Sequence, residues 1–272
     1  MHLPDDCPAE RFAHCPRAAL AAVRGVFTDI DDTLTRDGAL DPAALPALQA
    51  LQRANVPVIA ITGRPKGWSE PFARDWPLQA IVAENGAVAL LPDGATTRVE
   101  YAQDAATRAK NARRLQAAAA RVLREVPGAA LARDSAGRET DIAIDHSEFA
   151  HLDAAAIEHV VAVMRAEGLS ATVSSIHING WFGEHTKLSA AHWMLRRLYG
   201  RDLDAEIAHW IFVGDSTNDQ AMFGAFPLSV GVANLRRFAA QLHTWPTYIT
   251  DAERGAGFAE VAQALLAAAA AR

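Results

Sequence analysis

The sequence predicts an α/β protein whose core is a Rossmann-like parallel sheet and which carries a smaller inserted α/β unit. Short apolar runs end abruptly in polar residues or glycine, and this pattern repeats along the chain. Helical stretches separate the runs, as the crossovers of a parallel sheet require. The middle of the chain has a different pattern, with two helices and alternating strands.

Five apolar runs are expected to form parallel strands. Most are apolar on both faces, which is typical of a sheet covered by helices on each side. Ligands of such sheets bind beyond the carboxyl ends of the strands, so the polar residues that follow the runs should converge on one site. The runs are Val23 to Thr28, Val56 to Ile61, Ala80 to Ala83, His209 to Val213 and Leu228 to Val232.

Three helices are expected beside these strands. One starts at Asp41 as the N-cap, with Pro42 at the first helical position. A second covers Leu188 to Tyr199, with apolar residues at helical spacing, and a third closes the chain from about Phe258.

The inserted unit runs from about Leu91 to Asn179. Its first helix carries four arginines on its surface, and Gly168 ends its second helix. The expected features, in order, are a helix with Arg113, Arg114, Arg121 and Arg124, a strand from Thr140 to Asp145, a helix from Asp153 to Glu167 and an alternating strand from Ser170 to Ile178.

Composition excludes several classes of protein. The chain has 272 residues, half of them hydrophobic, which is enough for a large core and excludes intrinsic disorder. With 26 basic and 32 acidic residues the net charge is −6, and the basic clusters are short arginine pairs, so a nucleic-acid binder is not expected. No signal sequence or membrane span is recognised, and we expect a soluble, cytoplasmic protein. Cys7 and Cys15, with His14, are too few ligands for a zinc site, and free thiols in a surface segment are expected.

Asp29 and Asp31 are the first candidates for chemistry. They lie two residues apart at the end of a strand, so their side chains start on the same side of the chain. Two adjacent carboxylates repel, which is tolerable where a cation binds or where one of them keeps a proton. An acidic turn or a helix cap is the alternative interpretation.

Further strand ends add complementary groups. Thr62 offers a hydroxyl, and Gly63 leaves a backbone N–H accessible. Lys187, one of only three lysines, starts a helix and suits a phosphate. Asp215 and Asp219 add two carboxylates behind a glycine.

In this order, these residues resemble the four motifs of the haloacid-dehalogenase-like (HAD) superfamily of phosphohydrolases. The inserted unit and the segments Glu84-Asn85-Gly86 and Val232-Ala233-Asn234 resemble the branch with an α/β (type IIB) cap. That branch includes Cof-type sugar phosphatases, sucrose-phosphate phosphatase, mannosyl-3-phosphoglycerate phosphatase and phosphomannomutase. The resemblance implies a catalytic core of residues 1–90 and 181–272, and a cap of residues 91–180 that selects the substrate.

The resemblance implies a role for each motif residue. Asp29 would be the nucleophile and Asp31 the general acid and base. Phosphate would bind Thr62, Gly63 and Lys187. Mg²⁺ would be held by Asp29, the backbone carbonyl of Asp31, Asp215 and Asp219. Supporting residues would be Thr33, Arg64, Asn85, Asn218 and Asn234, and candidates for cap specificity are His177 and Asn179.

Some of these residues have ordinary alternatives. Arg64 is equally compatible with a solvent-exposed arginine at a helix start, and His177 with a packed strand histidine. The third motif also lacks the glycine that often follows the lysine, since Leu188 and Ser189 come next.

The implied function is a Mg²⁺-dependent phosphomonoesterase that hydrolyses a small sugar or polyol phosphate through an aspartyl phosphate. A phosphomutase related to phosphomannomutase is one alternative. A receiver-like domain that is phosphorylated on aspartate without turnover is another, and the size of the chain and the presence of Asp31 count against it. The sequence does not indicate the leaving group or the oligomeric state.

Overall fold

The computed structural model describes residues 8–270. The chain divides into two compact units: the first is Met1–Thr62, Asp75–Ile81 and Lys187–Arg272, and the second is Gly63–Arg74 and Val82–Thr186. The second unit takes in residues 63–74 and 82–90, which the sequence interpretation assigned to the core. The division of roles between a catalytic core and a cap stays a prediction.

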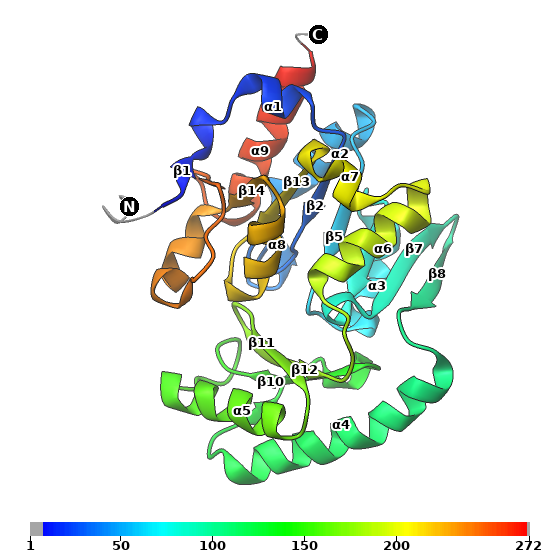
Figure 1. Ribbon diagram of the computed structural model, residues 1–272, viewed down its shortest axis with the longest axis vertical. Helices are drawn as coiled ribbons and strands as arrows, with labels where there is room; N and C mark the ends of the chain where they lie inside the picture. Colours follow the sequence, from blue (N-terminus) through cyan, green and yellow to red (C-terminus); the bar gives the residue numbers. More distant parts are fainter. Residues whose placement is uncertain (1–7, 271–272) are drawn as a thin grey trace. The chain divides into compact units, whose positions relative to one another are not determined.

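The first unit is built on a sheet with the strand order β1-β15-β14-β13-β2-β5-β6, of which β6 also reaches into the second unit (Figure 1). The pairings from β1 to β5 are all parallel. An α/β fold with a mostly parallel sheet is therefore confirmed. The strands are β1 (Glu10–Arg11), β2 (Gly25–Thr28), β5 (Val58–Ile61), β6 (Ala80–Ala83), β13 (Trp210–Gly214), β14 (Leu228–Gly231) and β15 (Tyr248–Ile249), and a separate small ladder pairs β3 (Thr35–Arg36) with β4 (Ala39–Leu40).

Helices cover this sheet in two groups. The first group, α1, α2 and α9, packs together on one face, and α6, α7 and α8 pack together on the other (Figure 1). Their bounds are α1 (Arg17–Ala21), α2 (Ala44–Arg53), α6 (Lys187–Tyr199), α7 (Leu203–Glu206), α8 (Gln220–Ala225) and α9 (Arg254–Ala269), and short 3-10 helices form at Phe12–His14, Ile207–His209, Thr217–Asp219 and Ala233–Gln241.

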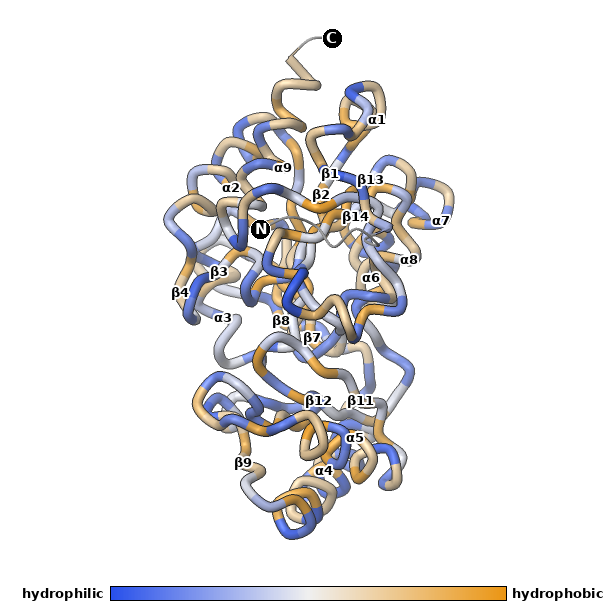
Figure 2. The backbone as a smooth tube through the Cα atoms, turned by 90° about the vertical axis from the view of Figure 1, so that its left-hand side faces the viewer, coloured by the Kyte–Doolittle hydropathy of each residue, from blue (hydrophilic) through white to orange (hydrophobic). Residues whose placement is uncertain are grey.

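The core of the first unit lies along the central strands. Every residue of β2, β5 and β13 is buried, and the tube in Figure 2 is orange at β2. Phe27 packs against Trp210 and Phe226 with ring centroids 4.9 Å and 5.7 Å apart. Each such buried side chain contributes roughly 1.5–3 kcal/mol by leaving water. The strand ends are thus fixed by a rigid sheet.

Two predicted helix starts need correction. Asp41 does not cap α2, which begins at Ala44; its carboxylate accepts hydrogen bonds from Ala43 N and Arg36 Nε, both at 2.9 Å, and closes the turn before the helix. Helix α9 begins at Arg254 rather than near Phe258. The sequence pattern placed the start too late because glycines in the first turn interrupt the apolar pattern. Helix α6 matches the expected range closely.

The second unit contains an antiparallel sheet with the strand order β11-β12-β10-β9. Helices α4 and α5 pack together on one face of it. A hairpin of β7 and β8 and the helix α3 also belong largely to this unit. The elements are α3 (Lys66–Asp75), a 3-10 turn (Glu84–Gly86), β7 (Val88–Asp93), β8 (Thr96–Tyr101), α4 (Ala105–Glu125), β9 (Ala130–Leu131), a 3-10 turn (Ser135–Gly137), β10 (Asp141–Asp145), α5 (Ala154–Ala166), β11 (Ser170–Val173) and β12 (His177–Trp181).

Two features of this unit differ from the sequence interpretation. The single strand expected over Ser170 to Ile178 is a hairpin, because Ser174 donates its N–H to the carbonyl of His177 (2.8 Å) and turns the chain. The hairpin β7–β8 was not predicted. Its two-residue turn is Gly94-Ala95, with Gly94 at φ 59°, and glycine at the first position of such a turn is a hairpin signal.

The sheet of the second unit has one apolar face and one polar face. Ile142, Ile144 and Ile178 join the hydrophobic cluster formed with α4 and α5. Because side chains alternate along a strand, Asp141 and Asp145 on β10 and their partners on β12 lie on the opposite face. This polar face carries both residues that the sequence suggested for specificity, His177 and Asn179.

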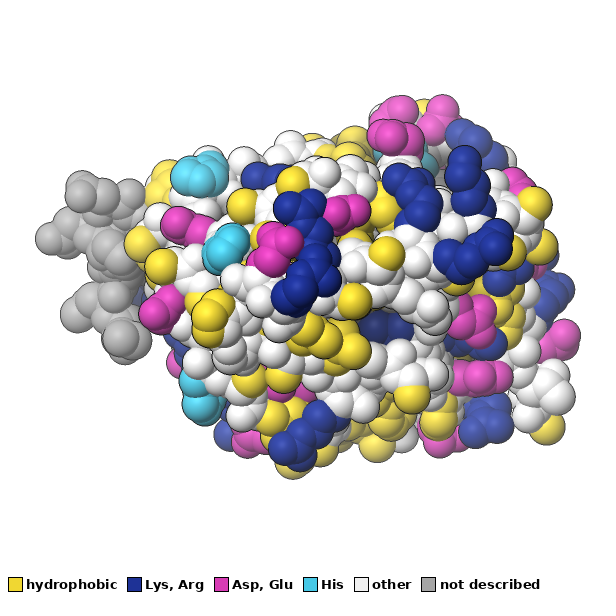
Figure 3. Space-filling view, turned by 90° about the horizontal axis from the view of Figure 1, so that it is seen from below, with side chains coloured by type: hydrophobic (Ala, Val, Ile, Leu, Met, Phe, Trp, Pro, Cys, Tyr) yellow, Lys and Arg dark blue, Asp and Glu magenta, His cyan; other side chains and the backbone are white. Residues whose placement is uncertain are grey.

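The surface and the termini add three observations. Figure 3 shows basic side chains interspersed with acidic and apolar ones on the face seen from below. Among residues 8–270, no helix combines the length and apolar character needed to cross a bilayer. Cys15 is a free thiol, but it is buried rather than at the surface, and Cys7 lies outside the described residues.

Candidate active site

Asp29 and Asp31 lie in a tightly bonded loop that follows β2. The carbonyl of Ile30 accepts hydrogen bonds from the N–H groups of Thr33 (3.2 Å), Leu34 (2.8 Å) and Thr35 (3.1 Å). Asp29 N donates to the carbonyl of Val213 on β13 (2.8 Å), which ties the loop to the neighbouring strand. Both carboxylates are buried. The backbone thus fixes the position of the expected nucleophile.

Lys187 joins two of the carboxylates at the carboxyl edge of the sheet. It is the first residue of α6, and its Nζ lies 2.6 Å from Asp29 Oδ1 and 2.7 Å from Asp219 Oδ1. Carboxylate oxygens of Asp29, Asp215 and Asp219 lie within 4.8 Å of one another. The third and fourth motifs therefore meet the first, as the sequence predicted.

Asp219 also organises the loop that follows β13. Its Oδ2 accepts hydrogen bonds from Asp215 N (3.0 Å) and Ser216 N (3.2 Å), and a capping box with Ser216 begins the next helical turn. A Cβ on Gly214 would lie 2.5 Å from Asp219 Oδ2, so only glycine fits there. Since both oxygens of Asp219 already have donors, this residue is better placed to position Asp215 than to be exposed as a direct ligand.

Burial dominates the electrostatics of the cluster. Burial raises the pKa of Asp29, with smaller increases from Asp219 and Asp31, while Lys187 opposes the change. Burial and the charge of Asp29 raise the pKa of Asp215 as well. Burial alone would lower the pKa of Lys187, but the charges of Asp219 and Asp29 outweigh it and raise that pKa. The charge of Lys187 thus does not offset the effect of burial on Asp29 and Asp215, whose pKa values both rise.

The carboxylate cluster fits a hard divalent cation. Asp215 Oδ1 is buried and has no hydrogen-bond partner among the described residues. A buried oxygen without a donor is costly unless a ligand satisfies it. Oxygen donors with excess negative charge are the ligands that Mg²⁺ prefers.

The remaining predicted residues of the first unit lie in the segments that follow its strands. Thr62 is buried and follows β5. Asn218 Oδ1 accepts a hydrogen bond from Ser216 Oγ (2.9 Å), which orders the fourth motif. Asn234 Nδ2 donates to the carbonyl of Asp32 (2.9 Å) and to Asp215 Oδ2 (3.2 Å), so it joins two of the loops. Thr33 is buried in the first loop.

Gly63 and Arg64 belong to the second unit and have partners there. The carbonyl of Gly63 accepts hydrogen bonds from Arg138 (2.9 Å) and Asn179 Nδ2 (3.3 Å). The guanidinium of Arg64 forms ion pairs with Asp134 (3.2 Å) and Glu148 (2.9 Å), and its side chain is only 5% exposed. The alternative of a solvent-exposed arginine is therefore wrong.

The other predicted residues of the second unit are also buried and bonded. Asn85, at φ 57°, and Asn179 each donate to Asp141 Oδ2 at 3.1 Å. His177 Nε2 lies 3.0 Å from Glu148 Oε2. Asn179 and His177 thus belong to one polar network on the polar face of the sheet, and their role in specificity stays a prediction.

Comparison with known families identifies the part of the chain that contains the first two motifs. The sequence model of the family described as haloacid dehalogenase-like hydrolase matches residues 26–112. This segment belongs to the haloacid dehalogenase-like hydrolases. The resemblance stated from the motifs is confirmed, and so is the expectation of an enzyme.

Solved structures with this HAD-like fold cover most of the chain. A Thermoplasma acidophilum protein has 15% identity and a TM-score of 0.67 over 90% of this chain and 98% of its own. The C-terminal domain of Candida albicans trehalose-6-phosphate phosphatase has 16% identity and a TM-score of 0.64, covering 97% and 99%. Sucrose-phosphatase from Synechocystis, in complex with sucrose and phosphate, has 14% identity and a TM-score of 0.64, covering 89% and 98%. A search of curated protein sequences finds no significant match.

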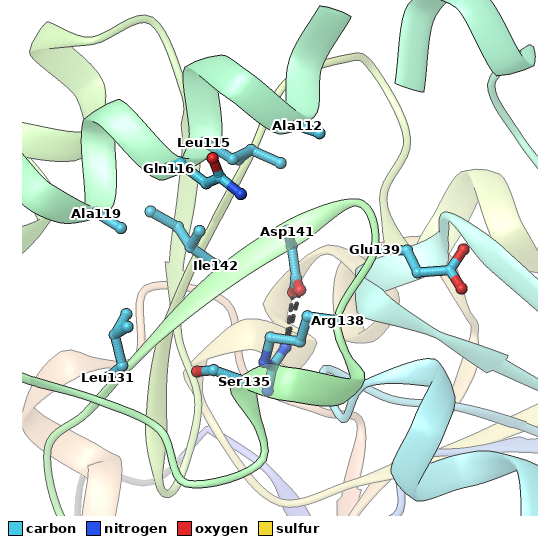
Figure 4. Close-up of a pocket in the computed structure, with 10 residues that line it drawn as sticks. All are labelled: Ala112, Leu115, Gln116, Ala119, Leu131, Ser135, Arg138, Glu139, Asp141 and Ile142. Carbon is cyan, nitrogen blue, oxygen red and sulfur yellow. Dashed lines mark hydrogen bonds and ion pairs between the residues drawn. The ribbon is translucent and has the colours of Figure 1, made fainter. Parts of the chain in front are cut away.

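Sequence reasoning missed the internal partners of several buried charged residues. The carboxylate of Glu84 accepts hydrogen bonds from the N–H groups of Lys66, Glu139 and Thr140 and from the Thr140 hydroxyl. Arg138 pairs with Asp141 at 2.9 Å beside a cavity of about 210 Å³ that α4 and β10 line (Figure 4). Burial raises the pKa of Asp141 to about 7, although Arg138 opposes the change. The partners of Glu84 come from separate segments, so nothing in the local sequence marks them. Arg138 and Asp141 are only three residues apart, but the sequence does not show that both are buried.

Proposed function

We propose that the protein is a Mg²⁺-dependent phosphomonoesterase that hydrolyses a small sugar or polyol phosphate. The observation that carries the proposal is the convergence of Asp29, Asp215 and Asp219 around Lys187 at the carboxyl edge of a parallel sheet. The family match and the phosphatases among the structural neighbours support this reaction class.

In the proposed reaction, Asp29 attacks the phosphorus and forms an aspartyl phosphate while the bond to the leaving oxygen breaks. Asp31 gives its proton to that oxygen and, as the conjugate base, then takes a proton from the water that hydrolyses the aspartyl phosphate. Phosphate leaves and both carboxyl groups return to their starting states. Lys187, the Thr62 hydroxyl and the Gly63 N–H balance the charge on the phosphoryl oxygens.

The residues that would hold Mg²⁺ are Asp29, Asp215 and the backbone of Asp31, with Asp219 positioning Asp215. The bound ion would neutralise negative charge on the phosphoryl group. Buried carboxylates that burial pushes toward protonation are also kept ionised by an adjacent dication, as a nucleophile requires.

A carbohydrate leaving group is proposed from two observations. Two structural neighbours are phosphatases named for trehalose-6-phosphate and sucrose substrates. In addition, the polar face of the sheet in the second unit carries amide, imidazole and carboxylate groups, the chemistry that binds sugar hydroxyls, although Asn179 and His177 bond to protein partners in this structure. We propose that this unit selects the substrate and that the enzyme acts in the cytoplasm.

Phosphate release from a panel of sugar, polyol and nucleotide monophosphates, with Mg²⁺ present, tests the proposal. We expect turnover of sugar or polyol phosphates by the wild type and none by Asp29→Asn, which keeps the shape of the nucleophile but not its reactivity. Asp75→Asn, at the exposed end of α3, is the matched control and should retain activity. Phosphate release by Asp29→Asn at the wild-type rate would contradict the proposal, and interconversion of hexose phosphate isomers without release would indicate a mutase.

A further inference from the structure

Arg254 lies at the start of α9 in a conformation that favours glycine. Its φ is 54°, which costs about 1–3 kcal/mol for a residue with a side chain. Such a cost persists only where surrounding contacts enforce it. The backbone N–H of Arg254 donates to Asn234 Oδ1 (2.9 Å), and its guanidinium Nε lies 2.8 Å from Asp32 Oδ1.

These contacts close a ring of three residues. Asn234 Nδ2 donates to the carbonyl of Asp32 (2.9 Å), so Asp32 is held at its carbonyl by Asn234 and at its carboxylate by Arg254. The same Nδ2 lies 3.2 Å from Asp215 Oδ2. The ring therefore connects the loop that carries Asp29 and Asp31 to a carboxylate of the cluster.

Arg254 also balances a carboxylate that the reaction does not use. Asp32, itself at φ 53°, directly follows Asp31, and the side chains of Asp32 and Arg254 are each 17% exposed. Without the guanidinium, the Asp32 carboxylate would lose this contact, and only Asn234 would hold the backbone of Asp32 in its strained conformation. A second carboxylate, that of Asp37, lies 3.8 Å from the guanidinium, and its side chain is largely exposed.

We infer that Arg254 is a positioning residue for the Mg²⁺ site, acting through Asp32 and Asn234. It fixes the carboxylate of Asp32 and so keeps the loop that carries Asp29 and Asp31 in a constant position relative to Asp215. This inference rests on the proposed function, since it concerns the affinity of the same site for Mg²⁺.

Arg254→Gly isolates the side chain, because glycine adopts positive φ without strain. We expect the Mg²⁺ concentration for half-maximal phosphate release to rise about tenfold, as for other residues that support metal ligands, with kcat at saturating Mg²⁺ within about twofold of the wild type. The Mg²⁺ concentration that raises the melting temperature should shift by the same factor. Arg254→Lys, which keeps the charge, should give an intermediate shift of about threefold.

A double-mutant cycle tests the route through Asp32. In an Asp32→Asn background, Arg254→Gly should change the Mg²⁺ requirement by less than about threefold, because the ion pair through which Arg254 acts is already gone. Arg11→Ala, which removes an exposed ion pair with Asp251, is the matched control and should leave the requirement unchanged.

Three results would overturn the inference: an unchanged Mg²⁺ requirement in Arg254→Gly, a loss confined to kcat, or an equal effect of Arg254→Gly with and without Asp32. If Arg254→Gly does not fold, Arg254→Lys takes its place: an unchanged Mg²⁺ requirement or a loss confined to kcat in this variant would overturn the inference. Absence of any Mg²⁺ effect on the wild type would overturn the proposed function along with the inference, whereas the three results above leave that function intact.

Discussion

Lys187 is a buried cation between two carboxylates, and its side chain is only 4% exposed. Exposed ion pairs contribute little to stability, but removing one partner of a buried pair leaves an uncompensated charge. The same ammonium is the charge that would meet the phosphoryl oxygens in the proposed reaction. Stability and catalysis therefore depend on the same side chain.

Lys187→Met, which keeps the length but removes the charge, should lower kcat for phosphate release at least about 100-fold. Without Mg²⁺ it should also lower the free energy of unfolding by roughly 3–5 kcal/mol, since Asp29 and Asp219 lose their counter-ion. Urea titration and a phosphate-release assay measure the two effects. Lys110→Met, on the exposed face of α4, should change neither. Turnover by Lys187→Met at the wild-type rate would exclude a role for this lysine.

At the scale of elements, sequence patterns located the strand ends well and the turns poorly. Strand β6 was predicted over its observed range, because a buried parallel strand is a continuous apolar run. Asp41 was predicted as the N-cap of α2, but the cap position is Ala43, two residues later. The sequence does not distinguish the two cases, because an aspartate closes a turn or caps a helix with the same kind of side-chain hydrogen bond. The ring around Arg254 could not be predicted, because no local pattern connects it to Asp32.

The turn after β10 is another element whose function in stability can be tested. Asp145 accepts hydrogen bonds from the N–H groups of Ser147, Glu148, Phe149 and Ala150, which fixes Glu148 in the turn. Burial alone would raise the pKa of Glu148, but His177 and Arg64 outweigh it and lower that pKa to about 2.

An acid whose pKa is lower in the folded state stabilises the fold above its ordinary pKa, here 4.5, and this contribution is lost as the pH falls toward about 2. Glu148→Gln should therefore cost roughly 1–3 kcal/mol at pH 7. The difference from the wild type should shrink as the pH is lowered below 4.5. Urea unfolding across this range measures it, with Glu158→Gln on the exposed side of α5 as the control. A cost that is independent of pH would mean that the ion pairs of Glu148 contribute nothing.

At the scale of the molecule, the cluster is assembled from segments far apart in the sequence. Asp29, Lys187 and Asp215 follow or begin elements that the parallel sheet brings to one edge. The topology of the sheet explains why motif order was enough to predict this convergence. It gives no information on how burial distributes charge among the carboxylates, which requires the positions of the side chains.

Removing divalent metal tests this charge balance in the whole protein. A buried Asp215 oxygen without a donor and carboxylates with raised pKa values should be stabilised by Mg²⁺. We expect EDTA to abolish phosphate release reversibly. In a calorimetric scan, Mg²⁺ at about 100 times its dissociation constant should stabilise the folded protein by about 2.7 kcal/mol. Asp215→Asn should lose most of this stabilisation while remaining folded without metal, because it removes one of the repelling charges. Full activity in EDTA, or the same Mg²⁺ effect in Asp215→Asn, would show that the carboxylate cluster does not bind the metal on which the proposed reaction depends.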